Sequence, residues 1–334
     1  MLLFSVFLFT VKSNKKLANR LFALFLLLTA FDFSGFFLGN TLNNYPTIKA
    51  LKIASSLLQM PVFYLYVLAT CYADFKLRPK HLLHTLLFLL FFITFKIASI
   101  SDQSFLRFTI IGELQYYAYI ILIFWSLRKY KAVYLENYAN NNDAYKWLFQ
   151  ITLFFCFAHL FVLVKLMLLF FGKDQGLLQN SYLLISTVAL FTICWFVLKA
   201  LYHPQLFTGV KIALEPIEVH EKTRTKYDKR AIPDEASIRL TNYMESEKPH
   251  LDFELTLQKL AAQIDLPEKE LSVLINQKIG KHFFDFINEY RIEDAKMLLK
   301  NQPQLTVLEI LYQVGLVPNH HFTPPSKRKL GLHH

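Results

Sequence analysis

Long uninterrupted apolar runs are the feature that most constrains the fold of this chain. Six of them are long enough to cross the roughly 30 Å hydrocarbon layer of a membrane, and they cover residues 17–39, 53–73, 81–100, 105–127, 147–171 and 177–201. Backbone polar groups in lipid must be hydrogen-bonded within the protein, so each run predicts a helix. The chain is 54% hydrophobic, with 33 Phe but only 9 Gly among 334 residues. We therefore expect a polytopic transmembrane bundle of six to seven helices in residues 1–202.

Residues 1–11 form an additional apolar stretch that is too short to cross a membrane alone. This stretch lacks the basic start and the small-residue cleavage site of a signal peptide. We interpret it as a seventh helix that lacks its N-terminal half, with the true start of the chain lying upstream.

The distribution of Lys and Arg predicts the orientation of the bundle. If the C-terminus is cytoplasmic, most basic residues of this part lie on inner loops and flanks, and the outer half holds only Lys49, Lys52, Lys96, Arg107, Lys165 and Lys173. Residues 1–202 contain 18 basic and 7 acidic residues, whereas residues 203–334 contain 18 of each. The formal net charge of +11 therefore comes from basic residues that flank the membrane spans, and it does not indicate a surface that binds nucleic acid. We expect a multi-pass protein of the inner (cytoplasmic) membrane whose C-terminal domain is cytoplasmic.

The sequence carries no pattern typical of catalysis or of metal binding. Cys71, Cys156 and Cys194 lie in apolar spans without the spacing of a metal site or a disulfide framework. Two adjacent histidine pairs near the C-terminus lack helical i,i+4 spacing, and no Gly-rich phosphate loop or GxSxG turn occurs. We predict that the protein is no enzyme and needs neither a cofactor nor a metal.

Four ionisable residues fall inside predicted spans, where a charge is costly unless it is paired or hydrated. They are Asp32, Lys96, Glu113 and Lys165, all in the outer halves of their helices under this topology. One hypothesis is that they line an outward-opening sensory pocket for an unknown signal ligand. The alternative is that both lysines extend to the outer interface and the acids pair with them for packing. His84 and His159 are expected to form hydrogen bonds between helices.

The composition changes abruptly after Leu201. Residues 203–232 are polar, charged and without apolar periodicity, which is typical of a linker. Residues 233–334 then read as short helices. "LTLQKLAAQIDL" begins with Thr256 as a candidate N-cap, Asp265 occupies a turn position, and "PEKELSVLINQKIG" follows with Gly280 as its stop. Two short helices joined by a tight turn predict a helix-turn-helix.

This region resembles the DNA-binding domain of AraC/XylS-type transcription regulators. The resemblance is carried by "LTLQKLAAQIDLPEKELSVLINQKIGKHFFDFINEYRIEDAKMLL" and "TVLEILYQVG", and it covers about residues 234–316. "HPQLF" and "KYDK" also resemble the junction in membrane-anchored members that carry a seven-helix sensor. The resemblance implies two helix-turn-helix units joined by a linker helix, which read operator DNA in the major groove. It leaves open whether the protein forms a homodimer and whether it contacts RNA polymerase.

Carried over to this sequence, the first recognition helix covers residues 267–278. Its candidate DNA-contacting residues are Lys269, Glu270, Ser272, Val273, Asn276, Gln277 and Lys278, with Leu271 and Ile275 facing inward. Asn and Gln can read adenine and Lys can reach guanine or phosphate, whereas Glu268 and Glu270 would repel phosphate. An ordinary solvated helix face is the alternative. Arg291 matches the family's linker-helix arginine, and we expect a structural role for it.

The end of the chain departs from the family. After Gly315 the family expects a pattern like GFxSKSSFxxAFKKxTGxTP, but this chain has "GLVPNHHFTPPSKRKLGLHH". A proline inside a helix costs about 3 kcal/mol or more, so the second recognition helix is broken. Back-translation with one T restored near Gly315–Leu316 permits the reading GFS(S/T)KSSF(H/Y)TAFK. We hypothesise a one-base loss at this point, in the genome or in the sequencing, which makes residues 317–334 aberrant.

The first helix of the second unit departs from the family as well. Leu311 stands where the family has a small alanine, and extra methylenes at a tight contact cost about 1–3 kcal/mol. Without the missing helices we expect Val307, Ile310 and Val314 to have little to pack against, and specific DNA binding to be weak or absent.

The sequence therefore predicts an all-α chain with a membrane bundle, one complete helix-turn-helix unit and one broken unit. The predicted function is a membrane-bound transcription regulator that couples a signal to operator DNA. Two alternatives are a membrane receptor that binds only protein partners and a non-functional frameshifted product. A transporter is disfavoured because no internal repeat or interrupted helix pair is evident.

Overall fold

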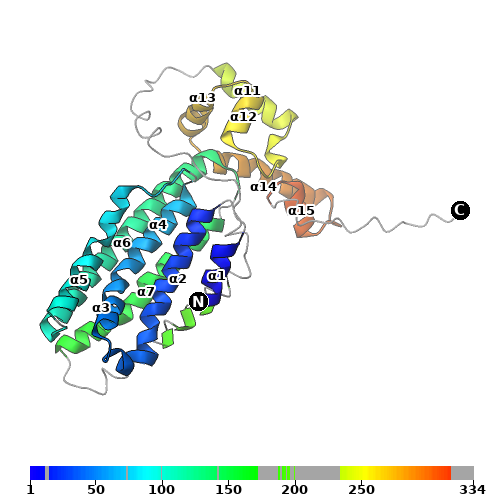
Figure 1. The fold of residues 1–334 in the computed structure, drawn as a ribbon. Helices are drawn as coiled ribbons and strands as arrows, with labels where there is room; N and C mark the ends of the chain where they lie inside the picture. Colours follow the sequence, from blue (N-terminus) through cyan, green and yellow to red (C-terminus); the bar gives the residue numbers. More distant parts are fainter. Residues whose placement is uncertain are drawn as a thin grey trace. The chain divides into compact units, whose positions relative to one another are not determined.

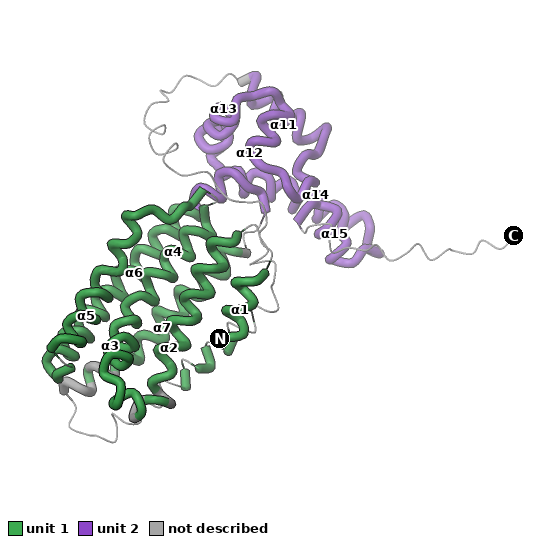
Figure 2. Tube along the Cα trace, viewed as in Figure 1, with its two compact units in different colours: residues 1–130, 143–216 green, residues 131–142, 217–334 purple. Residues whose placement is uncertain are grey.

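The computed structural model describes residues 1–11, 15–72, 74–98, 100–140, 143–171, 187–188, 190–192, 194–195, 199 and 234–316. All regular elements in these residues are helices, which confirms the predicted all-α class (Figure 1). The chain divides into two compact units (Figure 2): unit 1 has residues 1–130 and 143–216, and unit 2 has residues 131–142 and 217–334. Most of the predicted span at 177–201, the linker at 203–232 and the tail at 317–334 lie outside the described residues.

Unit 1 is a bundle of long apolar helices. Its described elements are α1 (Leu2–Thr10), α2 (Lys16–Leu42), α3 (Pro46–Ser55), η1 (Ser56–Leu58), α4 (Gln59–Cys71), η2 (Pro79–Thr85), α5 (Leu86–Ile97), most of α6 (Asp102–Asn137) and α7 (Asp143–Phe171). Five helical segments in the described residues are long and apolar enough to cross a membrane, and each overlaps one of the first five predicted spans, with ends that differ by up to ten residues. With 9 residues, α1 is too short to do so.

The second span, from Pro46 to Cys71, has a 3₁₀ turn at its middle where η1 separates α3 from α4. Pro61 lies just after this turn. A proline removes one helical hydrogen bond and crowds the carbonyl four residues earlier, here that of Leu57. The tighter turn at η1 lies where this crowding occurs.

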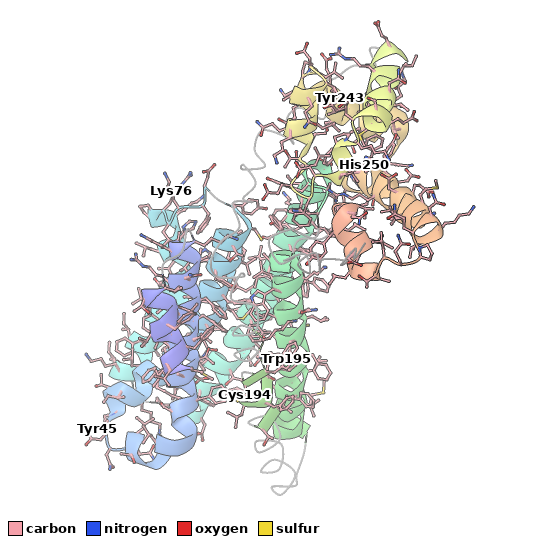
Figure 3. All side chains as sticks on the ribbon, turned by 90° about the vertical axis from the view of Figure 1, so that its right-hand side faces the viewer. Tyr45, Lys76, Cys194, Trp195, Tyr243 and His250 are labelled. Atoms are coloured by element: carbon pink, nitrogen blue, oxygen red, sulfur yellow. The ribbon has the colours of Figure 1, made fainter. Side chains whose placement is uncertain are left out.

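The two ends of the bundle are marked by Tyr45 and Lys76, which lie at opposite ends in Figure 3. Tyr45 precedes α3, in the loop predicted to be outside, and Lys76 follows α4, in a loop predicted to be inside. One part of the core packs α3 and η1 against α5 and α6 through Ala50, Ala54, Leu57, Phe91, Phe95 and Phe108. The small alanines allow this close helix approach.

Unit 2 is a separate domain of short helices. They are α11 (Asp234–Ser246), η3 (Pro249–Leu251), α12 (Leu257–Gln263), α13 (Glu268–Val273), η4 (Leu274–Ile279, a π-helical turn), α14 (Phe283–Asn301) and α15 (Val307–Gln313). Its core is one cluster of buried side chains: Leu240, Met244, Leu255, Leu257, Leu260, Ala261, Ile264, Leu271, Leu274, Ile275, Phe283, Phe286, Ile287 and Ala139.

Residues 131–142 are an integral part of unit 2, which the division predicted from the sequence did not include. Ala139 is 1% exposed in the core, and Tyr138 forms an isolated antiparallel bridge with Thr256. The carbonyl of Ala139 accepts hydrogen bonds from Arg291 Nη1 at 2.7 Å and from Asn288 Nδ2 at 3.1 Å. A segment between α6 and α7 therefore completes the helical domain.

The start of the second predicted helix-turn-helix unit is formed by α15. Thr306 and Glu309 make a capping box at its N-terminus. Ile310 and Val314 are 2% and 1% exposed, so the expectation that they would lack packing partners is wrong for both. Val307, by contrast, is 67% exposed, as that expectation required.

The chain passes very close to η3 just after α15. Gly315 has φ +73°, and a Cβ at this position would lie 2.5 Å from the carbonyl oxygen of Leu251. Both the backbone angle and the lack of space require glycine here. This close approach places the end of α15 against η3, where Ile310 and Val314 are buried.

Candidate functional site

Unit 1 contains a cavity of about 400 Å³ between its helices. Segments of α1, α2, η1, α4, α6 and α7 line it, together with Val188 and Thr192. Its wall is mainly apolar, with Phe4, Phe22, Phe25, Phe33, Phe108 and Phe155 among the lining residues. Cavities of this size and character commonly bind small molecules.

Two of the four charges predicted to form a sensory pocket meet at this cavity. Asp32 on α2 and Glu113 on α6 both line it. Lys96 does not, because it is exposed in the last turn of α5. The side chain of Lys165 lies outside the described part of the chain. Of the predicted pocket residues, Asp32 and Glu113 therefore line the cavity, and Lys96 does not.

Both acids have basic partners that differ from the predicted lysines. Asp32 pairs with Lys52 of α3, whose Nζ lies 3.1 Å from Oδ1. Glu113 Oε2 lies 2.6 Å from Nε2 of His159 on α7. The predicted hydrogen bonds of the two histidines between helices are thus confirmed for His159, and also for His84, whose Nδ1 lies 2.5 Å from the Tyr119 hydroxyl.

An aromatic ring holds the pair of Glu113 and His159 in place. Tyr116 stacks on the imidazole of His159 with ring centroids 3.6 Å apart and an angle of 8° between the planes. Its hydroxyl donates to the carbonyl of Phe155 at 3.0 Å. Tyr116 of α6 therefore contacts α7 twice, through its ring on His159 and through its hydroxyl on Phe155. These contacts keep the pair of Glu113 and His159 at the cavity wall.

Reasoning from charged residues inside the predicted spans did not find Gln59 and Tyr116, which are uncharged, or Lys52, which lies just before the span at 53–73. Gln59 begins α4 and lines the cavity, and its amide nitrogen is buried with no hydrogen-bond partner in the described structure. A single amide inside an otherwise apolar span was the available signal, because a neutral polar group in a membrane helix also needs a partner.

Two short helices joined by a tight turn, α12 and α13, lie in unit 2 where the sequence predicts a helix-turn-helix. Thr256 caps α12, its hydroxyl accepting from the backbone N–H of Lys259 at 3.1 Å. Asp265 has φ +52°, a left-handed angle that Asp tolerates better than most residues. The backbone N–H of Leu266 donates to the carbonyl of Ala261 at 3.0 Å and closes the turn before α13. The cap at Thr256 and the turn at Asp265 are thus confirmed.

The candidate DNA-contacting residues lie on α13 and the π-helical turn η4. Lys269, Glu270, Gln277 and Lys278 are exposed, and Ser272, Val273 and Asn276 are half-buried. Leu271 and Ile275 are fully buried, as predicted, and so is Leu274. The recognition helix was predicted as one regular helix, but its second half is a π-turn that ends at Gly280 with φ +77°.

Arg291 has no exposed surface and is the most deeply buried charged side chain among the described residues of unit 2. Its guanidinium donates to three backbone carbonyls, those of Ala139, His250 and Asp252, at 2.7, 2.7 and 2.8 Å. Burial lowers the pKa of Arg291 to about 10, which leaves it charged near neutral pH. These bonds to backbone carbonyls hold segments of the domain together, in agreement with the structural role predicted for Arg291.

His250, labelled in Figure 3, lies beside Arg291 in the same domain. Burial lowers the pKa of His250, although its bond to Asp294 at 3.0 Å opposes the shift. Its second ring nitrogen, Nδ1, is buried and has no hydrogen-bond partner in the described structure. Protonating both nitrogens would leave a buried donor unsatisfied, which favours the neutral imidazole.

No protein-family model, curated protein or solved structure matches this chain. The resemblance of residues 234–316 to AraC/XylS-type regulators therefore rests on the stretches quoted above and stays a prediction.

Proposed function

We propose that this chain is a membrane-bound transcription regulator of the inner membrane. In this proposal the bundle senses a signal in the membrane or at its outer face, and the cytoplasmic helical domain binds operator DNA. The observation that carries the proposal is the turn at Asp265, which joins α12 to α13 with apolar residues inward and polar residues outward. This is the local geometry with which a helix-turn-helix presents its second helix to the major groove.

The cavity in unit 1 supports the sensory half of the proposal. It combines an apolar wall with polar groups inside helices of membrane-spanning length. Buried polar groups in membrane helices are commonly associated with function because they are costly to maintain.

Residues 131–142 support the coupling between sensing and DNA binding. Residues 131–137 are the C-terminal end of α6, and Ala139 lies in the core of unit 2 beside α14. Tyr138 bridges to Thr256, the N-cap of the first helix of the helix-turn-helix. We propose that a displacement of α6 moves Tyr138 and, through the bridge, Thr256. This movement would change the positions of α12 and α13.

We propose further that this product binds DNA poorly. In the family that this chain resembles, a second recognition helix makes half of the direct contacts to DNA bases. Residues 317–334 carry prolines where that helix should be. The intact gene, with the reading frame restored near Gly315, would encode the functional regulator.

The test compares two full-length proteins in lipid nanodiscs, the present chain and the chain with the restored frame. Selection of binding sites from a random DNA pool should enrich a sequence only for the restored protein. Gln277→Ala should then cost about 1–3 kcal/mol at one base position. Lys296→Ala, on the exposed side of α14, is the control and should leave base preference unchanged. A restored protein that enriches no sequence would rule out the proposal.

Exposed Glu268 and Glu270 on α13 favour a second candidate, a receptor whose helical domain binds only a protein partner. The same selection separates the two, because that receptor would show no sequence-specific and salt-dependent DNA binding.

A further inference from the structure

The cavity of unit 1 restricts the chemistry of what it can hold. Its volume of about 400 Å³ suits a small molecule with a short apolar chain. Phe25 and Phe155 form part of its wall from α2 and α7, with ring centroids 5.6 Å apart. Several of the helices around it have the length and apolar character of membrane spans.

The charges in the wall are already paired. Asp32 and Glu113 are the acids among the described lining residues, and they are bonded to Lys52 and His159. A charged ligand would have to displace one of these basic partners or remain without a counter-charge in an apolar site, and both are unfavourable. The cavity therefore favours a neutral molecule.

One polar group in the wall is left for a ligand to satisfy. Gln59 lines the cavity, and its buried amide nitrogen has no hydrogen-bond partner in the described structure. A nearby amide on α6 shows the contrast, since Nε2 of Gln115 donates to the carbonyl of Leu57 at 3.1 Å. An N–H donor without a partner is costly in an apolar interior and requires an acceptor.

We propose that the cavity binds a neutral, mainly apolar molecule with one hydrogen-bond acceptor, and that Gln59 donates to this acceptor. A carbonyl oxygen, as in an ester, is an acceptor of this kind. The inference rests on the proposed sensory role of the bundle and specifies the class of its signal.

The test uses the full chain in lipid vesicles and a methyl decanoate that carries a diazirine in its chain. After illumination, mass spectrometry locates the labelled residues, which should belong to α2, α4, α6 and α7 at the cavity. Unlabelled methyl decanoate, decane, decanoate and decyltrimethylammonium then compete. The ester should compete about fivefold better than decane, since one net hydrogen bond is worth roughly that factor. Both ions should compete less well than the ester.

Three variants assign the effect to the cavity. Gln59→Leu should remove the advantage of the ester over decane while labelling by the probe persists, which also shows that the bundle remains folded. Gly112→Leu should abolish labelling, because this glycine lines the cavity and only ordinary contact with Leu57, at 3.5 Å from a Cβ, limits a side chain there. Leu114→Phe is the matched control, since this residue of the same helix is 68% exposed and lies outside the cavity wall.

Stronger competition by either ion, or an unchanged ester preference in Gln59→Leu, would overturn the proposed ligand class. Unchanged labelling in Gly112→Leu would show that the probe binds elsewhere and would overturn it as well. All of these measurements are made without DNA. A failure of the regulator function in the DNA selection would therefore be distinguishable from a failure of the ligand class.

Discussion

Arg291 is the residue whose removal should cost unit 2 the most stability. It has no exposed surface, and it ties α14 to residues 131–142 and to the segment around η3 through three backbone carbonyls. Arg291→Met keeps a side chain of similar length but removes every donor. The carbonyl of Ala139 would keep its bond from Asn288, and that of Asp252 its bond from the N–H of Leu255. No hydrogen bond within the described residues would replace the one that the carbonyl of His250 loses.

The magnitude follows from these three bonds. A hydrogen bond to a charged group contributes about 1.5–3 kcal/mol. The removed charge also loses its desolvation cost, which offsets part of the sum. We therefore expect the free energy of unfolding of unit 2 to fall by about 3–5 kcal/mol, a large share of the roughly 5–15 kcal/mol that holds a domain folded.

Hydrogen–deuterium exchange of the full chain in nanodiscs measures this loss locally. Peptides covering residues 249–256 and 283–291 should exchange roughly 10² to 4 × 10³ times faster in Arg291→Met, because each 1.4 kcal/mol is a factor of ten. Lys296→Met is the control, since its side chain is 64% exposed and pairs with exposed Glu293. If both variants exchange within about threefold of the parent, the three bonds contribute little and the reasoning is wrong.

Three further predictions concern unit 2. Gly315→Ala should lower its stability by about 1–3 kcal/mol in thermal unfolding, because φ is +73° and a Cβ would meet the Leu251 carbonyl oxygen at 2.5 Å; an unchanged midpoint would contradict this. Because burial lowers the pKa of His250, the unfolded chain takes up a proton at higher pH than the folded domain. The contribution of neutral His250 to the free energy of unfolding should be fully present above about pH 6.5 and should be lost as the pH falls below this value. In denaturant titrations, His250→Gln should flatten this pH dependence. Cysteines at Tyr138 and Thr256 should form a disulfide under mild oxidation, since residues opposite each other in an antiparallel bridge have Cα atoms about 4.5–5.5 Å apart; either single variant is the control, and absence of the bond would exclude the bridge.

The positions of the helices could be predicted because they depend on local properties of the chain. Apolar runs of sufficient length marked the five described spans, and Thr256, Asp265 and Gly280 marked where helices of unit 2 begin or end. A cap, a left-handed residue and an apolar period act over a few residues, so they can be read without knowing the fold. The π-turn η4 could not be predicted, because Leu271, Leu274 and Ile275 have the i, i+3, i+4 spacing of a regular α-helix.

The sensory site was predictable only in part. Asp32 and Glu113 were found because a charge in an apolar span is conspicuous, yet their partners Lys52 and His159 were not assigned to them. The sequence offered several bases to each acid, and only the packing of the helices decides which one is within reach. Gln59 was missed because it is uncharged, although its cost in an apolar interior has the same origin.

The sequence by itself determined that the chain is helical, that its first part has spans of membrane length, and that an Asp-containing turn joins α12 to α13. The tertiary structure alone decided that Ala139 belongs to the core of unit 2, bonded to an arginine 152 residues away. It alone decided that Ile310 and Val314 are buried while Val307 is exposed. The physical reason is that burial and pairing depend on which distant segments come together, whereas helix formation depends mainly on neighbours along the chain.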